Sequence, residues 1–192
     1  MPLYLITHAH THARPDQDAT LWHLSEQGQT QAEALSRQPF WPQVDYVVVS
    51  AEPKTLLTLQ PILAHRNLPV VRDARFNELV RGGWDAGYTA HVAATFANPE
   101  QSVDGWEAAA TALARFRAGI DNLTATTPGA IIALVGHGLT FSLYRAFLLG
   151  QEQVHLDDWR KLSFAAVAQV DPTTDTLLTD FTPVAGDAFR GG

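Results

Sequence analysis

Hydrophobic residues are grouped in short continuous runs along the chain, and more polar segments separate these runs. A short run of apolar residues, without alternating polar positions, is typical of a strand that is buried on both faces, as in a parallel sheet. The sequence therefore predicts buried strands at residues 3–6, 46–49, 69–71, 131–135 and 164–168.

Segments that resemble helices lie between these runs. Residues 25–36 begin with a capping serine, and a second helix is predicted to open at Pro53 and to bend at Pro61. Apolar residues recur every three or four positions over residues 103–123, which predicts the clearest amphipathic helix, and residues 139–149 predict another. Strands that alternate with helices indicate the α/β class, here a three-layer α/β/α sandwich with a mostly parallel central sheet.

The pattern predicts one domain over residues 1–192, because neither an internal repeat nor a linker interrupts it. Residues 80–102 contain several glycines and predict a long irregular insertion over the strand ends. Near the end of the chain, residues 177–178 predict a short edge strand and residues 190–192 a frayed terminus.

Composition and charge narrow the classes of protein that fit. The chain has 192 residues, 46% of them hydrophobic, and no cysteine, so we expect a cytoplasmic protein without disulfides. Its formal net charge of −7 and the lack of a basic patch indicate that it does not bind nucleic acid. Neither a secretory signal nor a membrane span is expected.

Two of the predicted strands end in a histidine. His8 follows the run at residues 3–6, and His137 follows the run at residues 131–135 and precedes a predicted helix. Ligands of open α/β sheets bind beyond the carboxyl ends of the strands. The two histidines are therefore predicted to share one site.

The residues near these strand ends fit phosphoryl transfer. A neutral imidazole such as that of His8 can accept a phosphoryl group, which splits a slow transfer into two easier steps. The reaction also needs positive charge around the phosphoryl oxygens and an acid for the leaving oxygen. Arg14 and Lys54 are candidate cations, the helix after His137 offers amides, and Glu78 is a candidate proton donor.

Five segments resemble, in order, the motifs of the histidine phosphatases, also called the phosphoglycerate mutase-like superfamily. The resemblance extends from residue 3 to about residue 170. Its motifs correspond to Thr7-His8-Ala9, to residues 24–32 (LSEQGQTQA), to residues 50–58 (SAEPKTLLT), to residues 78–84 (ELVRGGW) and to Val135-Gly136-His137-Gly138.

The resemblance implies a role for each matched residue. His8 would be the phosphoryl acceptor, Glu78 the general acid and His137 a stabiliser of the transferring group, without a metal or other cofactor. Lys54 would stand in the place of a phosphate-binding arginine. Lysine does not reproduce the two-pronged contact of a guanidinium with phosphate.

Two further residues of the predicted phosphate site depart from the family pattern. Thr7 stands where the family has its other signature arginine, and Ala9 where it has a glycine. Arg14 lies where an asparagine is common, and we expect it to compensate partly for Thr7. The predicted phosphate-binding residues are therefore Thr7, Arg14 and Lys54.

The sequence favours a phosphomonoester hydrolase that acts on a small phosphorylated metabolite through a phosphohistidine. Its substrate would be set by residues 80–102 and by the surroundings of Arg14, Arg81 and Tyr88, while Trp84 and Trp106 are interpreted as packing aromatics. The oligomeric state stays open.

Two alternatives stay open. The altered pocket also fits an impaired member of the family that only binds an anion. Alternate residues of an extended strand point to the same side, so His8, His10 and His12 also fit a metal-dependent hydrolase.

Overall fold

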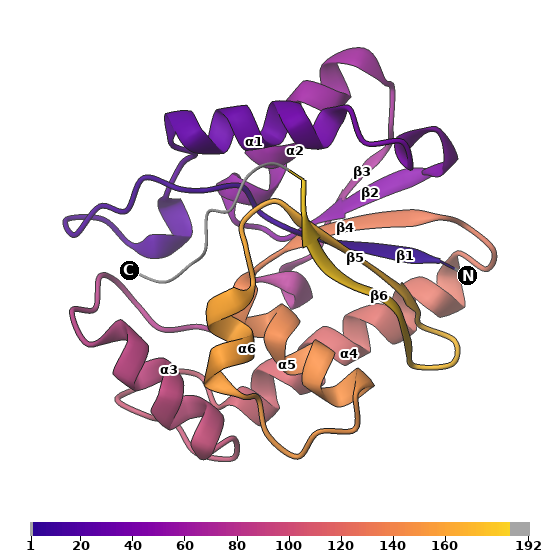
Figure 1. Ribbon diagram of the computed structural model, residues 1–192. Helices are drawn as coiled ribbons and strands as arrows, with labels where there is room; N and C mark the ends of the chain where they lie inside the picture. Colours follow the sequence, from indigo (N-terminus) through magenta and orange to yellow (C-terminus); the bar gives the residue numbers. More distant parts are fainter. Residues whose placement is uncertain (1, 185–192) are drawn as a thin grey trace.

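The computed structural model describes residues 2–184, which form a six-stranded sheet with helices on both faces (Figure 1). The strands are β1 (Leu3–Thr7), β2 (Tyr46–Val49), β3 (Val70–Arg72), β4 (Ile132–Gly136), β5 (Ala166–Asp171) and β6 (Thr176–Pro183). Their order in the sheet is β3-β2-β4-β1-β5-β6. The first four strands are parallel, whereas β5 pairs antiparallel with both β1 and β6.

The helices form the two outer layers. α1 and α2 cover one face of the sheet, and α4 and α5 lie on the other, with α3 and α6 beside them (Figure 1). The α-helices are α1 (Glu26–Ser36), α2 (Pro53–His65), α3 (Tyr88–Ala97), α4 (Ala109–Thr126), α5 (Gly138–Leu148) and α6 (Leu156–Lys161). The short 3-10 helices are η1 (Ala19–Leu21), η2 (Trp41–Gln43) and η3 (Ala74–Phe76).

Alternate residues of β1 pack into two separate hydrophobic cores, one on each face of the sheet. Leu3 and Leu5 pack with Phe116 of α4 and Phe141 of α5. Tyr4 and Ile6 face the opposite way, in a cluster that includes residues of α1 and α2. Both faces of β1 are therefore buried, which is why the apolar run is continuous in the sequence.

Gly28 fixes how closely α1 approaches the loop after β1. A Cβ at this position would lie 2.0 Å from the carbonyl oxygen of His10, so that any larger residue would collide with backbone. The side chain of Ser25 caps the same helix by accepting a 3.1 Å hydrogen bond from Gly28 N. This close contact brings residues 8–12 and α1 into one fixed unit.

Four of the five predicted strands are confirmed to within one residue, and the fifth is shifted. The strand predicted at residues 164–168 is β5, which begins at Ala166 and runs antiparallel to β1. Ala165 has a φ of 47°, a left-handed conformation that no strand contains. The backbone therefore turns before the strand begins.

The helix predicted over residues 103–123 begins later than expected, at Ala109. Asp104 and Gly105 have φ values of 50° and 80°, and these left-handed residues break a right-handed helix. Trp106 therefore lies outside the helix, although it is buried as its place in the apolar pattern suggested.

The remaining differences are local. Residues 80–102 are not wholly irregular, because they include α3. α2 continues through Pro61, and its neighbours Leu59 and Ile62 pack into the core beneath the helix. The strand predicted at residues 177–178 extends over the whole of β6. The frayed end predicted at residues 190–192 lies outside the described residues.

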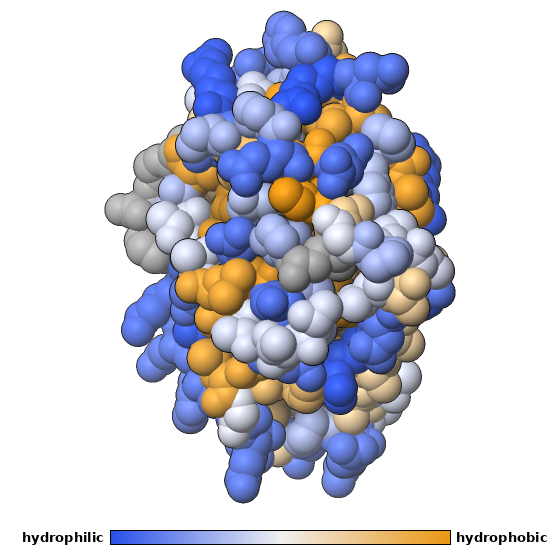
Figure 2. All heavy atoms as spheres, turned by 90° about the vertical axis from the view of Figure 1, so that its right-hand side faces the viewer, coloured by the Kyte–Doolittle hydropathy of each residue, from blue (hydrophilic) through white to orange (hydrophobic). Residues whose placement is uncertain are grey.

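The predicted site residues lie at only one end of the sheet. Figure 2 shows the side at which β1 begins, where hydrophilic and hydrophobic residues are interspersed. Within residues 2–184, none of the helices has the length and apolar character that a membrane crossing needs. The histidines of the predicted site lie at the other end of the strands.

Candidate active site

A cavity of about 570 Å³ opens where β1 and β4 end. Thr7 and Gly136 are paired in the parallel register of these strands, so His8 and His137 follow side by side, with ring centroids 5.3 Å apart. Charged, histidine and aromatic side chains make up much of its lining: His8, Trp22, Lys54, Glu78, Arg81, Trp84, Tyr88, His137, Trp159 and Phe164. The structure therefore brings together four residues of the predicted site: His8, Lys54, Glu78 and His137.

His8 is held in one tautomer. Its Nδ1 lies 2.8 Å from the carbonyl oxygen of Ala9, and a carbonyl oxygen only accepts. Nδ1 therefore carries the proton, and in the neutral ring the lone pair lies on Nε2. The backbone fixes the loop as well, because His8 N donates to Gly136 O at 2.9 Å and Ala9 N donates to Thr58 Oγ1 at 2.9 Å.

His137 is fully buried at the start of α5. Its Nε2 lies 2.8 Å from the hydroxyl oxygen of Ser50 and 3.5 Å from a carboxylate oxygen of Glu52. These contacts come from the segment that follows β2, so three neighbouring strands contribute to one site.

The carboxylate of Glu78 lies against the amino end of α5. Its Oε1 accepts hydrogen bonds from the backbone of Leu79 and Thr140, and its Oε2 accepts one from Leu139 N, all at 3.1 Å. A carboxyl group offers about four acceptor positions. Oε2 accepts only one of these bonds and therefore keeps acceptor capacity.

Glu52, which is not among the residues predicted from the sequence, connects Lys54, Glu78 and His137. Its Oε2 lies 2.8 Å from Lys54 Nζ, and its Oε1 accepts a 2.8 Å hydrogen bond from Glu78 N as well as facing His137. Both Glu52 and Lys54 are buried. The available signal in the sequence is a glutamate two residues before the predicted phosphate-binding lysine.

Lys54 reaches the cavity, but a neighbouring carboxylate offsets its charge. Besides the ion pair with Glu52, its Nζ donates to the carbonyl oxygen of Ala19 at 2.7 Å. An ammonium group has three donors, so one is left for a ligand. We call His8, Glu52, Lys54, Glu78 and His137 the floor of the cavity.

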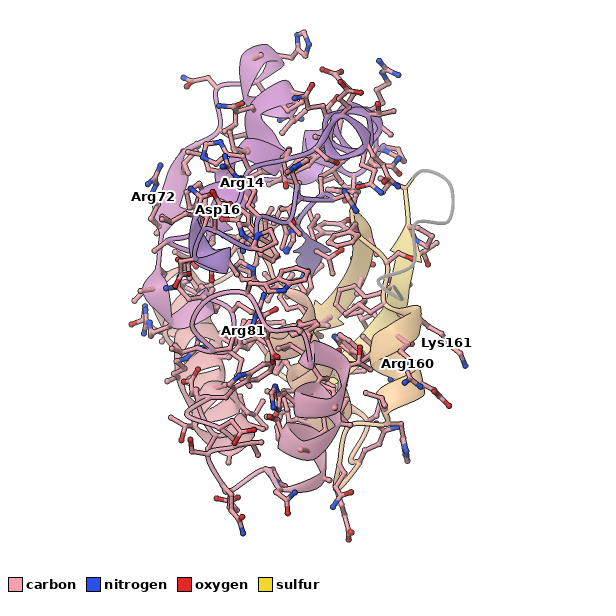
Figure 3. All side chains as sticks on the ribbon, turned by 90° about the vertical axis from the view of Figure 1, so that its left-hand side faces the viewer. Arg14, Asp16, Arg72, Arg81, Arg160 and Lys161 are labelled. Atoms are coloured by element: carbon pink, nitrogen blue, oxygen red, sulfur yellow. The ribbon has the colours of Figure 1, made fainter. Side chains whose placement is uncertain are left out.

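The other two predicted phosphate-binding residues lie elsewhere. The hydroxyl of Thr7 is buried, donates to Ser163 O at 2.8 Å and accepts from Ala166 N at 2.9 Å, so it joins β1 to the segment leading into β5. Arg14 is exposed and pairs with Asp16 at 2.9 Å, apart from Arg81 (Figure 3). Neither residue lines the cavity, so the structure does not bring them together with the other predicted site residues.

The histidines of the first loop do not form the metal site of the alternative prediction. No group of three or more His, Asp or Glu side chains in residues 2–184 could hold a metal ion. Nδ1 of His8 is bonded to Ala9 O, and Nδ1 of His10 lies 2.7 Å from the Ser25 hydroxyl. The Nδ1 atoms of His8 and His10 therefore serve local hydrogen bonds.

Aromatic side chains and one arginine surround the opening. The Arg81 guanidinium lies 4.6 Å from the Tyr88 ring centroid and 5.7 Å from that of Trp22. Trp84, which we had interpreted as a packing residue, is 51% exposed and its ring centroid lies 6.3 Å from that of Trp22. We call Trp22, Arg81, Trp84 and Tyr88 the rim of the cavity.

His91 links two aspartates near the rim residues Trp84 and Tyr88. His91 of α3 bonds to Asp85, and its Nε2 lies 2.7 Å from Asp104 Oδ2. The hydrogen bond to Asp85 and the two neighbouring negative charges raise the pKa of His91, and the same hydrogen bond lowers the pKa of Asp85. The start of α3 is thereby tied to the loop before α4.

Comparison with known families agrees with this geometry. A model of the histidine phosphatase superfamily (branch 1) matches residues 3–179, and the chain belongs to that superfamily. The predicted family and fold class are confirmed.

Several solved structures have the same fold as this chain at low sequence identity. YhfR of Bacillus stearothermophilus has a TM-score of 0.78 at 18% identity, covering 96% of this chain and 98% of its own. A putative alpha-ribazole-5'-P phosphatase of Escherichia coli K-12 has a TM-score of 0.73 at 21% identity, with 97% and 98% covered. A mycobacterial glucosyl-3-phosphoglycerate phosphatase has a TM-score of 0.72 at 22% identity, with 96% and 99% covered. Comparison with curated proteins gave no match.

Proposed function

We propose that the protein is a phosphomonoester hydrolase that acts on a small phosphorylated metabolite through a phosphohistidine on His8. The observation that carries the proposal is the tautomer of His8. Its Nδ1 is bonded to Ala9 O, which leaves the lone pair on Nε2 within a side chain that lines the cavity. A ring held in this way loses little freedom when it attacks.

In the first step, Nε2 of His8 attacks the phosphorus atom. The N–P bond forms as the bond from phosphorus to the ester oxygen breaks, and the leaving oxygen takes a proton. Glu78 is the proposed donor, from the position on Oε2 that its three backbone contacts leave open. His137 and the remaining donor of Lys54 are proposed to stabilise the charge on the phosphoryl oxygens.

In the second step, water attacks the phosphohistidine. The N–P bond breaks, the electron pair returns to Nε2, and the proton lost by water passes to the Glu78 carboxylate. Inorganic phosphate and the starting form of the enzyme result. Each step uses the same acid–base group in opposite directions.

The test is hydrolysis of a generic phosphomonoester by wild type and two histidine variants. We expect turnover by wild type, a loss of at least about a thousandfold in His8→Ala, since a nucleophile is removed, and near-normal turnover in His12→Ala. His12 is exposed on the same loop, so it is a matched control. Turnover that survives in His8→Ala would rule out this function.

The weak positive charge of the cavity favours a second candidate function, binding of an anion without turnover. The charge of Lys54 at the floor is offset by Glu52 at 2.8 Å, and the arginine of the rim lies among aromatic rings. The transition state therefore receives less positive charge than a pocket with free arginines would supply. Wild-type protein that binds inorganic phosphate but leaves phosphomonoesters intact would favour this candidate.

A further inference from the structure

Five aromatic side chains line the cavity. Trp22, Trp84, Tyr88, Trp159 and Phe164 all line it. Trp84 exposes about half of its surface, and it is the one tryptophan among the large exposed hydrophobic residues of the described chain. An indole left this open loses the benefit of burial unless a ligand covers it.

The two rim tryptophans come from different parts of the chain. Trp22 follows η1 in the loop after β1, whereas Trp84 lies in the loop before α3. Their ring centroids are 6.3 Å apart and the planes are inclined by 45°. Two loops thus place neighbouring indole rings in the lining of the cavity that also contains His8.

The rim holds little positive charge to spare for a second anionic group. The pKa of Asp18 is lowered, chiefly by hydrogen bonds from Thr20 and further by the charges of Arg81 and Lys54. Asp85 lines the cavity together with Arg81, and its pKa is lowered mainly by its hydrogen bond from His91 and further by the charge of Arg81. Asp85 therefore accompanies Arg81 in the cavity lining, and Glu52 pairs with Lys54.

We propose that the rim binds the leaving group of the substrate as a flat ring, so that the substrates are phosphomonoesters of alcohols carrying an aromatic or heteroaromatic ring. This inference rests on the proposed function, because it places the phosphoryl group at His8 and the ring beside Trp84. The Arg81 guanidinium, which lies over Tyr88, keeps that side of the rim flat. Phosphomonoesters with a second acidic group are disfavoured by the carboxylate of Asp85, which lines the cavity.

Phosphonates that cannot be hydrolysed separate this inference from the proposed function. Calorimetry would compare benzylphosphonate, methylphosphonate and phosphonoacetate, which share the phosphate-like group and differ in a ring or a second acid. We expect benzylphosphonate to bind wild type about tenfold more tightly than methylphosphonate, as stacking on one indole provides. Phosphonoacetate should bind no more tightly than methylphosphonate.

Two variants assign the preference to the rim. Trp84→Ala should remove most of the tenfold gain for benzylphosphonate and leave methylphosphonate unchanged, whereas Trp84→Phe should keep much of it. Leu178→Ala is a matched control, because Leu178 is equally exposed, at 51%, but lies on β6 away from the cavity. We expect it to bind all three compounds like wild type.

The outcomes distinguish the two proposals. Equal affinity for benzyl- and methylphosphonate, or tightest binding of phosphonoacetate, would overturn the ring inference even if the protein hydrolyses phosphomonoesters. A ring preference that depends on Trp84 would support the inference even if His8→Ala retains turnover, which would overturn only the phosphohistidine function.

Discussion

The floor and the rim of the cavity differ in how their side chains are held. His8, Glu52 and His137 expose 6%, 4% and 0% of their surface, whereas Trp84 exposes 51%. The floor is fixed by hydrogen bonds that involve the backbone of β4, Glu78 and α5, whereas ring contacts link the rim residues. A rigid floor suits a reaction that needs fixed geometry, and an open rim suits recognition of varied leaving groups.

The largest expected effect comes from the Glu52–Lys54 pair at the floor. Glu52→Gln leaves the buried ammonium of Lys54 without its counter-charge, which should lower the free energy of unfolding by about 3–5 kcal/mol. Lys54→Met should cost a similar amount. The double variant should cost much less than the sum, because no unpaired charge remains. Denaturation in urea measures all four proteins, and additive losses would show that the pair is not coupled.

Substitution of two glycines compares the packing beside the loop that carries His8 with the packing in the segment that carries the rim. Gly28→Ala places a methyl group against His10 O, which should lower the free energy of unfolding by about 1–3 kcal/mol. A Cβ at Gly83, in the rim segment, would meet nothing within 4 Å, so Gly83→Ala should change stability by less than about 0.5 kcal/mol. Urea denaturation would contradict the account if both variants behaved alike.

The tie between α3 and its neighbouring loops should depend on pH. Because the pKa of His91 is raised in the folded state, its contribution to stability is present below its unfolded pKa of about 6.5 and is lost as pH rises through the folded pKa. The difference in melting temperature between wild type and His91→Gln should therefore shrink from about pH 6 to about pH 10. A difference that is constant over this range would mean that the charge on His91 does not tie the segment.

The smallest effect is expected at Arg14. Its ion pair with Asp16 is exposed, with side-chain exposures of 56% and 68%, and such pairs contribute about 0–1 kcal/mol. Arg14→Ala should leave phosphate affinity and turnover unchanged, since the residue does not line the cavity. A loss of phosphate affinity measured by calorimetry would restore Arg14 to the predicted phosphate site.

The sequence was enough to predict β1 to β4 to within one residue and the proximity of His8 to His137. Both histidines follow continuous apolar runs, and parallel strands end at the same edge, so their proximity depends only on topology. The start of α4 was harder, because the left-handed residues Asp104 and Gly105 depend on contacts outside the local pattern.

The electrostatic partners of the site could not be predicted from the sequence. Lys54 is close to Glu52 in the sequence, but whether the two pair or face a ligand depends on how α2 is buried. Arg14 could reach the pocket or Asp16, and the loop conformation decides between them. Trp84 has a large apolar side chain of the kind that usually lies in a core, yet it is exposed at the surface.

The central claim is that Nε2 of His8 carries the phosphoryl group, and trapping that intermediate tests it most directly. Wild-type protein would be mixed with a labelled phosphomonoester, quenched within one turnover in alkali, and mapped by mass spectrometry. The account predicts an acid-labile phosphoryl group on His8 that forms and decays at rates matching turnover. Turnover with no phosphoryl group on His8, or with one on another residue, would contradict it.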